Sequence, residues 1–282
     1  MNFQYDEFSP RDIEALKPAM KVGILATINP QGLPHLTMIS TLMASSARQV
    51  VWGQFMEGLS KEFIRNNPKT GFLVMSLDKQ FWRGKATFSH TKTDGQDYDF
   101  YNNTPLFRYN SYFGLHTVYY MDLVSQSGGL PLPMNKIIFS SLKTMTAKFL
   151  SGNKSSSPVM NLWTQSLFDK LDNLKFLGTI DDDGYPIIIP LIQAQALDPS
   201  HVVFSSGAFG EEIKSIKTGS TVAIFDLSLK MEDVLVRGTY QGVRRLVGFE
   251  CGIVEINWIY NSMPPKPMQI YPALPVQPVI EF

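Results

Sequence analysis

The chain alternates between short apolar runs and turn-forming residues, a pattern typical of β-strands. In the first half, strands are predicted over 21–29, 34–43, 48–54, 70–77, 81–91 and 116–124. In the second half, they are predicted over 174–181, 186–196, 201–205, 221–227, 233–243 and 249–259. Helices are predicted after Ser9, around 60–68 and near 161–172. The pattern therefore indicates a mainly β fold (β-barrel/α+β class) with peripheral helices.

The chain also contains an internal repeat. Thr27, Gly32 and Pro34 recur 152 positions later as Thr179, Gly184 and Pro186, and Arg83-Gly84 recurs as Arg237-Gly238. Such a repeat sets the size of the structural unit. We expect a first β domain over 1–127, a connector over 128–165 and a second β domain over 166–282, which ends in a proline-rich extended arm.

The connector is expected to carry one amphipathic helix. Ile138, Leu142, Met145 and Phe149 recur at helical spacing, with lysines at 136, 143 and 148 among them. We expect this apolar stripe to pack against the β domains. Binding of the helix to a membrane surface is the less favoured alternative.

Composition narrows the possible functions. The 282 residues are 44% hydrophobic and 18% charged, with a net charge of zero, which argues against a polyanion as the main partner. Residues 1–160 hold 16 basic and 11 acidic residues, against 9 and 14 in 161–282, so an anionic ligand would suit the first half better. The lone Cys251 excludes an intrachain disulfide, and no apolar run approaches the roughly 18 residues that span a bilayer. A cytoplasmic protein is expected.

Familiar catalytic signatures are absent from the sequence. No glycine-rich phosphate loop, nucleophile elbow or Cys/His metal motif is present. The histidines, which are His35, His90, His116 and His201, are scattered without ligand spacing. We therefore predict no metal site and assign no catalytic residue.

Three segments of the first half form a recognisable series. They are 23–35, then 50–54 followed by Ser60-Lys61 and 66–69, and finally 82–86. In order and spacing they resemble the pyridoxamine 5′-phosphate oxidase-like, FMN-binding split-barrel superfamily over roughly 10–127, and more weakly over 166–260. The resemblance implies two tandem split β-barrels that form a pseudo-dimer within the chain. It also implies FMN as cofactor and an FMN-dependent oxidoreductase acting on a small-molecule redox substrate.

The resemblance also implies where FMN binds. Ser60 and Lys61, at the start of a helix, would hold the phosphate, since free amides and the helix dipole attract anions there. The strand residues along the flavin ring would be Thr37, Met38, Ile39 and Ser40, with Gln54 and Arg83 near the phosphate or the ring edge. Structural alternatives remain open: Ser60 as an N-cap only, and Met38 and Ile39 as core residues.

The second repeat and the chain end differ from the family pattern. Gly210-Glu211-Glu212 replaces Ser60-Lys61 and would repel phosphate, so one FMN per chain is expected. Thr37 and Leu42 stand where the family has a basic pair, and its C-terminal Arg/His motif is missing. Pyridoxamine phosphate is therefore not expected as the substrate. Alternatives are a non-catalytic flavin-binding or sensing protein, and a haem-binding split barrel. No nucleic-acid or membrane partner is expected, while a further homodimer is possible.

Overall fold

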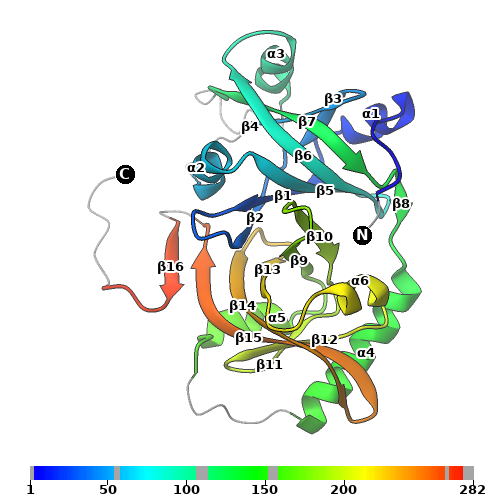
Figure 1. The fold of residues 1–282 in the computed structure, drawn as a ribbon, viewed down its shortest axis with the longest axis vertical. Coiled ribbons are helices and arrows are strands. Elements are labelled where there is room, and N and C mark those ends of the chain that lie inside the picture. Colours follow the sequence, from blue (N-terminus) through cyan, green and yellow to red (C-terminus); the bar gives the residue numbers. More distant parts are fainter. Residues whose placement is uncertain (1–2, 54–57, 106–113, 152–157, 264–266, 276–282) are drawn as a thin grey trace. The chain divides into compact units, whose positions relative to one another are not determined.

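The computed structural model describes residues 3–53, 58–105, 114–151, 158–263 and 267–275 (Figure 1). The chain divides into two compact units. Unit 1 comprises Met1–Leu132 together with Ile180–Ile188, and unit 2 comprises Pro133–Thr179 together with Ile189–Phe282. A short segment of the second repeat therefore belongs to the unit formed by the first.

Unit 1 is built on an antiparallel sheet with the strand order β2-β1-β5-β6-β7-β4-β3, in which β8 also pairs with β6. Its strands are β1 (Lys21–Ile28), β2 (Pro34–Met38), β3 (Met43–Ser46), β4 (Gln49–Gly53), β5 (Lys69–Ser76), β6 (Gln80–Lys92), β7 (Val118–Gln126) and β8 (Leu130–Pro131). Its helices are α1 (Pro10–Leu16), α2 (Leu59–Asn66) and α3 (Gln96–Asn103).

The second sheet has the corresponding order β10-β9-β13-β14-β15-β12-β11, and β16 pairs with β15. Its strands are β9 (Leu174–Ile180), β10 (Pro186–Pro190), β11 (Gln195–Asp198), β12 (His201–Ser205), β13 (Thr221–Leu227), β14 (Asp233–Leu246), β15 (Phe249–Asn261) and β16 (Met268–Tyr271). The helices are α4 (Met134–Ser151), α5 (Leu162–Asp169) and α6 (Gly210–Ser215). The shared order confirms the predicted mainly β, duplicated architecture.

The repeated glycines have the same backbone tasks in both copies. Gly32 and Gly184 have φ angles of 76° and 79°, in the left-handed region that glycine adopts without a Cβ penalty. A Cβ on Gly84 would lie 2.2 Å from the Ser125 carbonyl oxygen, and one on Gly238 would lie 2.1 Å from that of Glu255. Each of these last two positions therefore admits only glycine beside its partner strand.

Two predicted strands are each interrupted. The expected strand 34–43 is divided into β2 and β3, and 186–196 is divided into β10 and β11. In each case a tight turn separates the parts: the Leu42 amide donates to the Ile39 carbonyl, and the Ala194 amide donates to the Leu191 carbonyl. Buried apolar residues stand at both ends of each turn, so hydropathy alone does not reveal the break; they are Ile39 and Leu42 in one copy and Leu191 and Ala194 in the other.

The helix α4 differs from the prediction in which face it buries. Ile137, Ser140, Thr144 and Ala147 are buried, whereas the predicted stripe is exposed at all of its positions, which are Ile138, Leu142, Met145 and Phe149. The Thr144 hydroxyl accepts a 2.9 Å hydrogen bond from the Ser205 amide of β12. Small side chains allow this close approach to the sheet, so the prediction that the bulky stripe packs against a β domain is wrong.

Candidate functional site

The predicted phosphate site lies at the start of α2, next to β2. Ser60 is fully buried in the first turn of α2, and its hydroxyl lies 2.7 Å from the hydroxyl of Thr37 on β2. The residue that precedes the helix as N-cap is Gly58, not Ser60. The interpretation of Ser60 as an N-cap is therefore wrong; its side chain instead joins the helix to the sheet.

The N-terminus of α2 differs chemically from those of two other helices. In α1 and α5 the side chains of Ser9 and Asn161 accept hydrogen bonds from first-turn amides. In α2 the Gly58 N-cap offers no side chain for this purpose. Lys61, half-buried in the first turn, adds a positive charge to the positive end of the helix dipole. This arrangement can attract an anionic group such as a phosphate.

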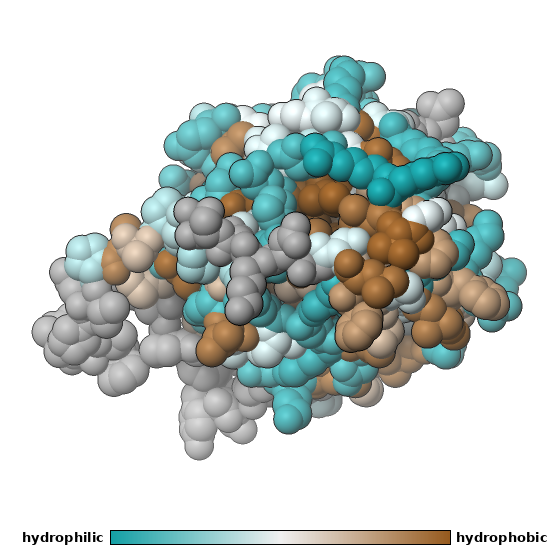
Figure 2. Space-filling model, turned by 90° about the horizontal axis from the view of Figure 1, so that it is seen from below, coloured by the Kyte–Doolittle hydropathy of each residue, from teal (hydrophilic) through white to brown (hydrophobic). Residues whose placement is uncertain are grey.

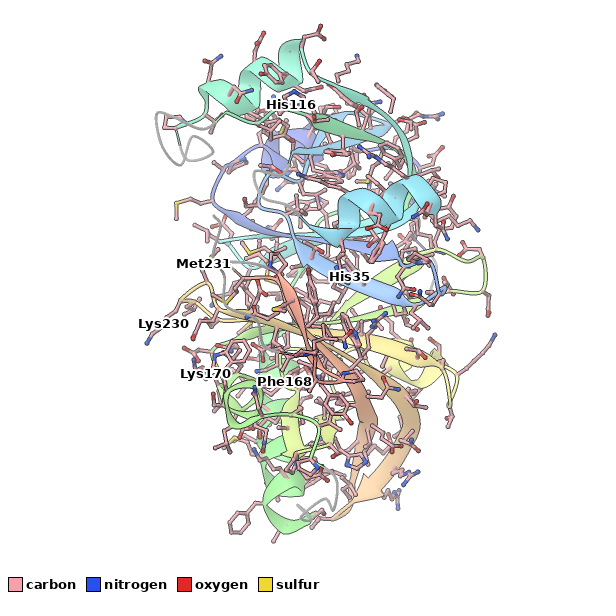
Figure 3. All side chains as sticks on the ribbon, turned by 90° about the vertical axis from the view of Figure 1, so that its left-hand side faces the viewer. His35, His116, Phe168, Lys170, Lys230 and Met231 are labelled. Carbon is pink, nitrogen blue, oxygen red and sulfur yellow. The ribbon has the colours of Figure 1, made fainter. Side chains whose placement is uncertain are left out.

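Packing below the helix fixes its position on the sheet. The ring of His35 on β2, labelled in Figure 3, contacts Phe63 of α2 edge-on, with ring centroids 5.2 Å apart. Both side chains are buried, and Ile64 on the next position of α2 enters the main core of unit 1. The start of α2 is therefore held by a polar contact at Ser60 and by apolar contacts one turn later.

The register of the sheet separates the predicted ring-binding residues. Thr37 lies in one row with Leu25 and Phe72, which belong to the core of unit 1. Met38 lies in the adjacent row, which continues through Ile24 and Leu73 to Arg83. Because successive side chains of a strand point to opposite faces, Thr37 faces the core while Met38 and Arg83 share the other face.

The remaining predicted residues have different surroundings. Ile39 is buried in the main core of unit 1, and Ser40 is partly exposed in the turn after β2. Arg83 is buried, and one of its terminal guanidinium nitrogens donates a 3.1 Å hydrogen bond to the Ile188 carbonyl. Gln54 lies outside the described residues. Thr37 and Ser60 are thus in direct contact, whereas Arg83 lies on the opposite face of the sheet.

Sequence reasoning missed a cluster of charges on the same face as Arg83. The Lys85 ammonium lies 2.9 Å from an Asp181 carboxylate oxygen and 2.7 Å from one of Asp183. Next to it, the hydroxyls of Thr87 and Tyr185 lie 2.8 Å apart. The spacing of Lys85 and Thr87 on β6 placed them on one face, but nothing in the sequence indicated that the turn 181–185 meets them.

The electrostatics of this cluster keep it charged. Although burial by itself lowers the pKa of Lys85, hydrogen bonds to Asp183 and Asp181 and their negative charges raise it above its ordinary value. Burial has the opposite effect on Asp181 and by itself raises the pKa of its carboxyl group. Hydrogen bonds from Lys85 and from the Asp182 amide outweigh burial and bring this pKa below its ordinary value. The cluster is therefore an ion pair that fastens the segment 180–188 to β6, rather than a proton-transfer site.

The corresponding helix of the second repeat has the opposite charge. Glu211 and Glu212 occupy the first turn of α6, whose N-cap Phe209 offers no polar side chain. Carboxylates stabilise a helix start by themselves, and they repel a phosphate. The structure thus places Lys61 and the acidic pair at corresponding helix starts, as the sequence repeat predicted.

Among the described residues, no group of three or more His, Cys, Asp or Glu side chains could hold a metal ion. Figure 3 shows His35 and His116 on different parts of the fold. A cavity of about 740 Å³ opens between α1, the β5–β6 turn and Gly129, but it is lined by none of the predicted site residues. The described helices include none that is long and apolar enough to cross a membrane.

Comparison with known proteins gave matches to solved structures only. No family model matches the chain, and no curated protein matches its sequence. HupZ of Group A Streptococcus is 12% identical, with a TM-score of 0.35 over 42% of this chain and 91% of that one. An FMN-binding protein from Syntrophomonas wolfei is 16% identical, with a TM-score of 0.35 over 43% and 86% of the two chains.

A candidate pyridoxamine 5′-phosphate oxidase from Lactobacillus delbrueckii is 11% identical, with a TM-score of 0.33 over 44% of this chain and 95% of that one.

Proposed function

We propose that the chain binds one FMN through unit 1 and acts as an FMN-dependent oxidoreductase on a small-molecule substrate. The observation that carries the proposal is the start of α2, where a helix N-terminus without a side-chain cap lies beside Lys61. The contact between Thr37 and Ser60 holds this helix end against β2, the strand along which the sequence resemblance places the flavin.

The parts of the site have distinct tasks in this proposal. The first-turn amides of α2 and the Lys61 ammonium bind the phosphate, since a fixed dipole and a positive charge act together. Thr37 and Ser60 position the helix, because both side chains are buried and their hydroxyls join β2 to α2. The bound flavin would itself supply the hydride or electron transfer, with the protein orienting it.

In this proposal the flavin supplies the redox chemistry and unit 1 orients the flavin. A non-catalytic flavin-binding protein would have the same site and would differ only in lacking turnover.

The test is a titration of the purified protein with FMN, followed by flavin fluorescence. Lys61→Glu reverses the charge at the start of α2 and should weaken binding by at least tenfold. Glu212→Lys makes the mirror-image change at the start of α6 and should leave binding within about twofold. Equal effects of the two changes would refute the assignment to unit 1, and no binding by the unaltered protein would refute the flavin proposal. A Soret band in the purified protein would favour haem instead.

A further inference from the structure

The outward face of α4 is apolar over most of its length. Ile138, Leu142, Met145 and Phe149 follow one another at helical spacing, and their side chains are 53%, 54%, 40% and 88% exposed. Phe139 and Leu150 widen the stripe and are also exposed. A helix in a soluble unit normally turns such a stripe toward the core. Here the stripe lies opposite the buried residues Ser140, Thr144 and Ala147.

The side chains of the stripe are accessible to a partner because they are exposed. In Figure 1, α4 is the long green helix that runs to the bottom of the view. Figure 2 looks at the molecule from below and shows hydrophobic surface gathered right of centre. A contiguous apolar patch of this kind on a protein surface marks an interaction site.

The charges around the stripe point to the partner. The sequence of α4 contains three lysines and no acidic residue. Lys136 and Lys143 are exposed, and they lie at one border of the stripe at helical spacing. On the opposite, buried face of the helix, Leu246 and Phe249 of the β14–β15 hairpin pack against the cluster that contains Ala147.

The acidic residues of this region already have basic partners. Asp169 of α5 forms an ion pair with Lys148 at the other border of the stripe. Glu250 of β15 lies 2.7 Å from Lys214. Lys136 and Lys143, exposed beside the apolar stripe, therefore give α4 a positive border, although residues 161–282 as a whole are acidic.

We infer that α4 is an interfacial helix that binds the surface of an anionic membrane. The bulky side chains enter the boundary between headgroups and acyl chains, and Lys136 and Lys143 contact anionic headgroups. The helix lies on the bilayer and does not cross it. This inference replaces the expectation that the stripe packs inside the protein, and it is independent of the FMN site.

The test is sedimentation of the full chain with vesicles at low ionic strength. Vesicles of phosphatidylcholine mixed with phosphatidylglycerol should bind the protein, while vesicles of phosphatidylcholine alone should bind it far more weakly. Lys143→Glu changes the local charge by two and should weaken binding to the anionic vesicles about thirtyfold. Raised salt should weaken binding by the unaltered protein.

The apolar contribution is tested with Leu142→Ser/Phe149→Ser, which should abolish sedimentation with either kind of vesicle. Leu162→Ser is the matched control, since Leu162 is 85% exposed but belongs to α5; it should bind as the unaltered protein does. An unchanged thermal midpoint shows that the double variant is folded. Equal binding to both vesicle types, or no vesicle binding by the unaltered protein, would overturn the inference. So would a dimer in solution that the double variant converts to a monomer, because the stripe would then contact a second copy.

Discussion

The ion cluster between β6 and the turn 181–185 gives a quantitative test of how unit 1 is held together. We predict that Lys85→Met destabilises the protein by about 2 kcal/mol at neutral pH. Methionine keeps the length and much of the packing of the lysine stem but removes its charge. The two carboxylates that remain lose their common partner.

The magnitude follows from how exposed the partners are. Breaking a fully buried pair costs roughly 3–5 kcal/mol, whereas an exposed pair contributes about 0–1 kcal/mol. The side chain of Lys85 is 7% exposed and that of Asp181 is 21% exposed, which is close to the buried limit. Asp183 is 51% exposed and regains water easily. Asp181 also keeps the hydrogen bond from the Asp182 amide, so the expected cost lies between the two limits.

The effect should depend on pH in one direction. The pKa of Asp181 is lower in the folded protein than in the unfolded chain, so its pairing stabilises the fold above about pH 4. This stabilisation is lost as the pH falls through the lowered pKa. The pKa of Lys85 is raised in the folded protein, so the stabilisation from its charge is fully present below the ordinary pKa of lysine. It is lost only as the pH rises above that value through the raised pKa. The difference between the two proteins should therefore be constant near neutrality and shrink in acid.

Urea unfolding followed by tryptophan fluorescence measures the difference at pH 7 and pH 3, and Trp82 on β6 places a reporter in the same strand. The control is Lys85→Met in a background of Asp181→Asn/Asp183→Asn, where it should cost little. A difference below about 0.5 kcal/mol at pH 7, or one that is unchanged at pH 3, would refute the ion-pair argument.

Three further predictions concern the strands and the buried polar groups. Gly84→Ala should lower the free energy of unfolding by more than about 3 kcal/mol, because the added Cβ meets the Ser125 carbonyl. Gly210→Ala is the control and should be nearly neutral in thermal or urea unfolding, because no atom lies within 4 Å of its added Cβ. Thr37→Val should cost about 1–2 kcal/mol by leaving the buried Ser60 hydroxyl without its partner; a neutral result in the same assay would contradict the role given to that contact. Burial raises the pKa of Asp226 to about 7, so the folded form keeps a proton that the unfolded chain loses above about pH 4, and stability should fall as pH rises across that window. Asp226→Asn should flatten this part of the stability profile, and an unchanged slope would show that Asp226 is not its source.

The sequence predicted the local conformation wherever neighbouring residues along the chain determine it. The turns at Gly32 and Gly184 were predictable because glycine adopts the left-handed backbone conformation that both turns contain. The alternation of apolar residues predicted most strands, and the repeat predicted two similar β domains, whose sheets have the same strand order in the structure. The family resemblance pointed to Ser60 and Lys61 as the phosphate site, and the helix start that the local sequence predicts there is present, with both residues in the first turn of α2.

Contacts between distant residues were decided only by the tertiary structure. Periodicity identified the apolar stripe of α4, but it did not reveal that small residues on the other face would approach β12 more closely and leave the stripe exposed. The pairing of Lys85 with Asp181 and Asp183 joins positions almost 100 residues apart, and no local pattern encodes it. A sequence specifies the conformations that depend on neighbouring residues. Which face of a helix such as α4 is buried depends instead on the shape of the sheet surface against which the helix packs.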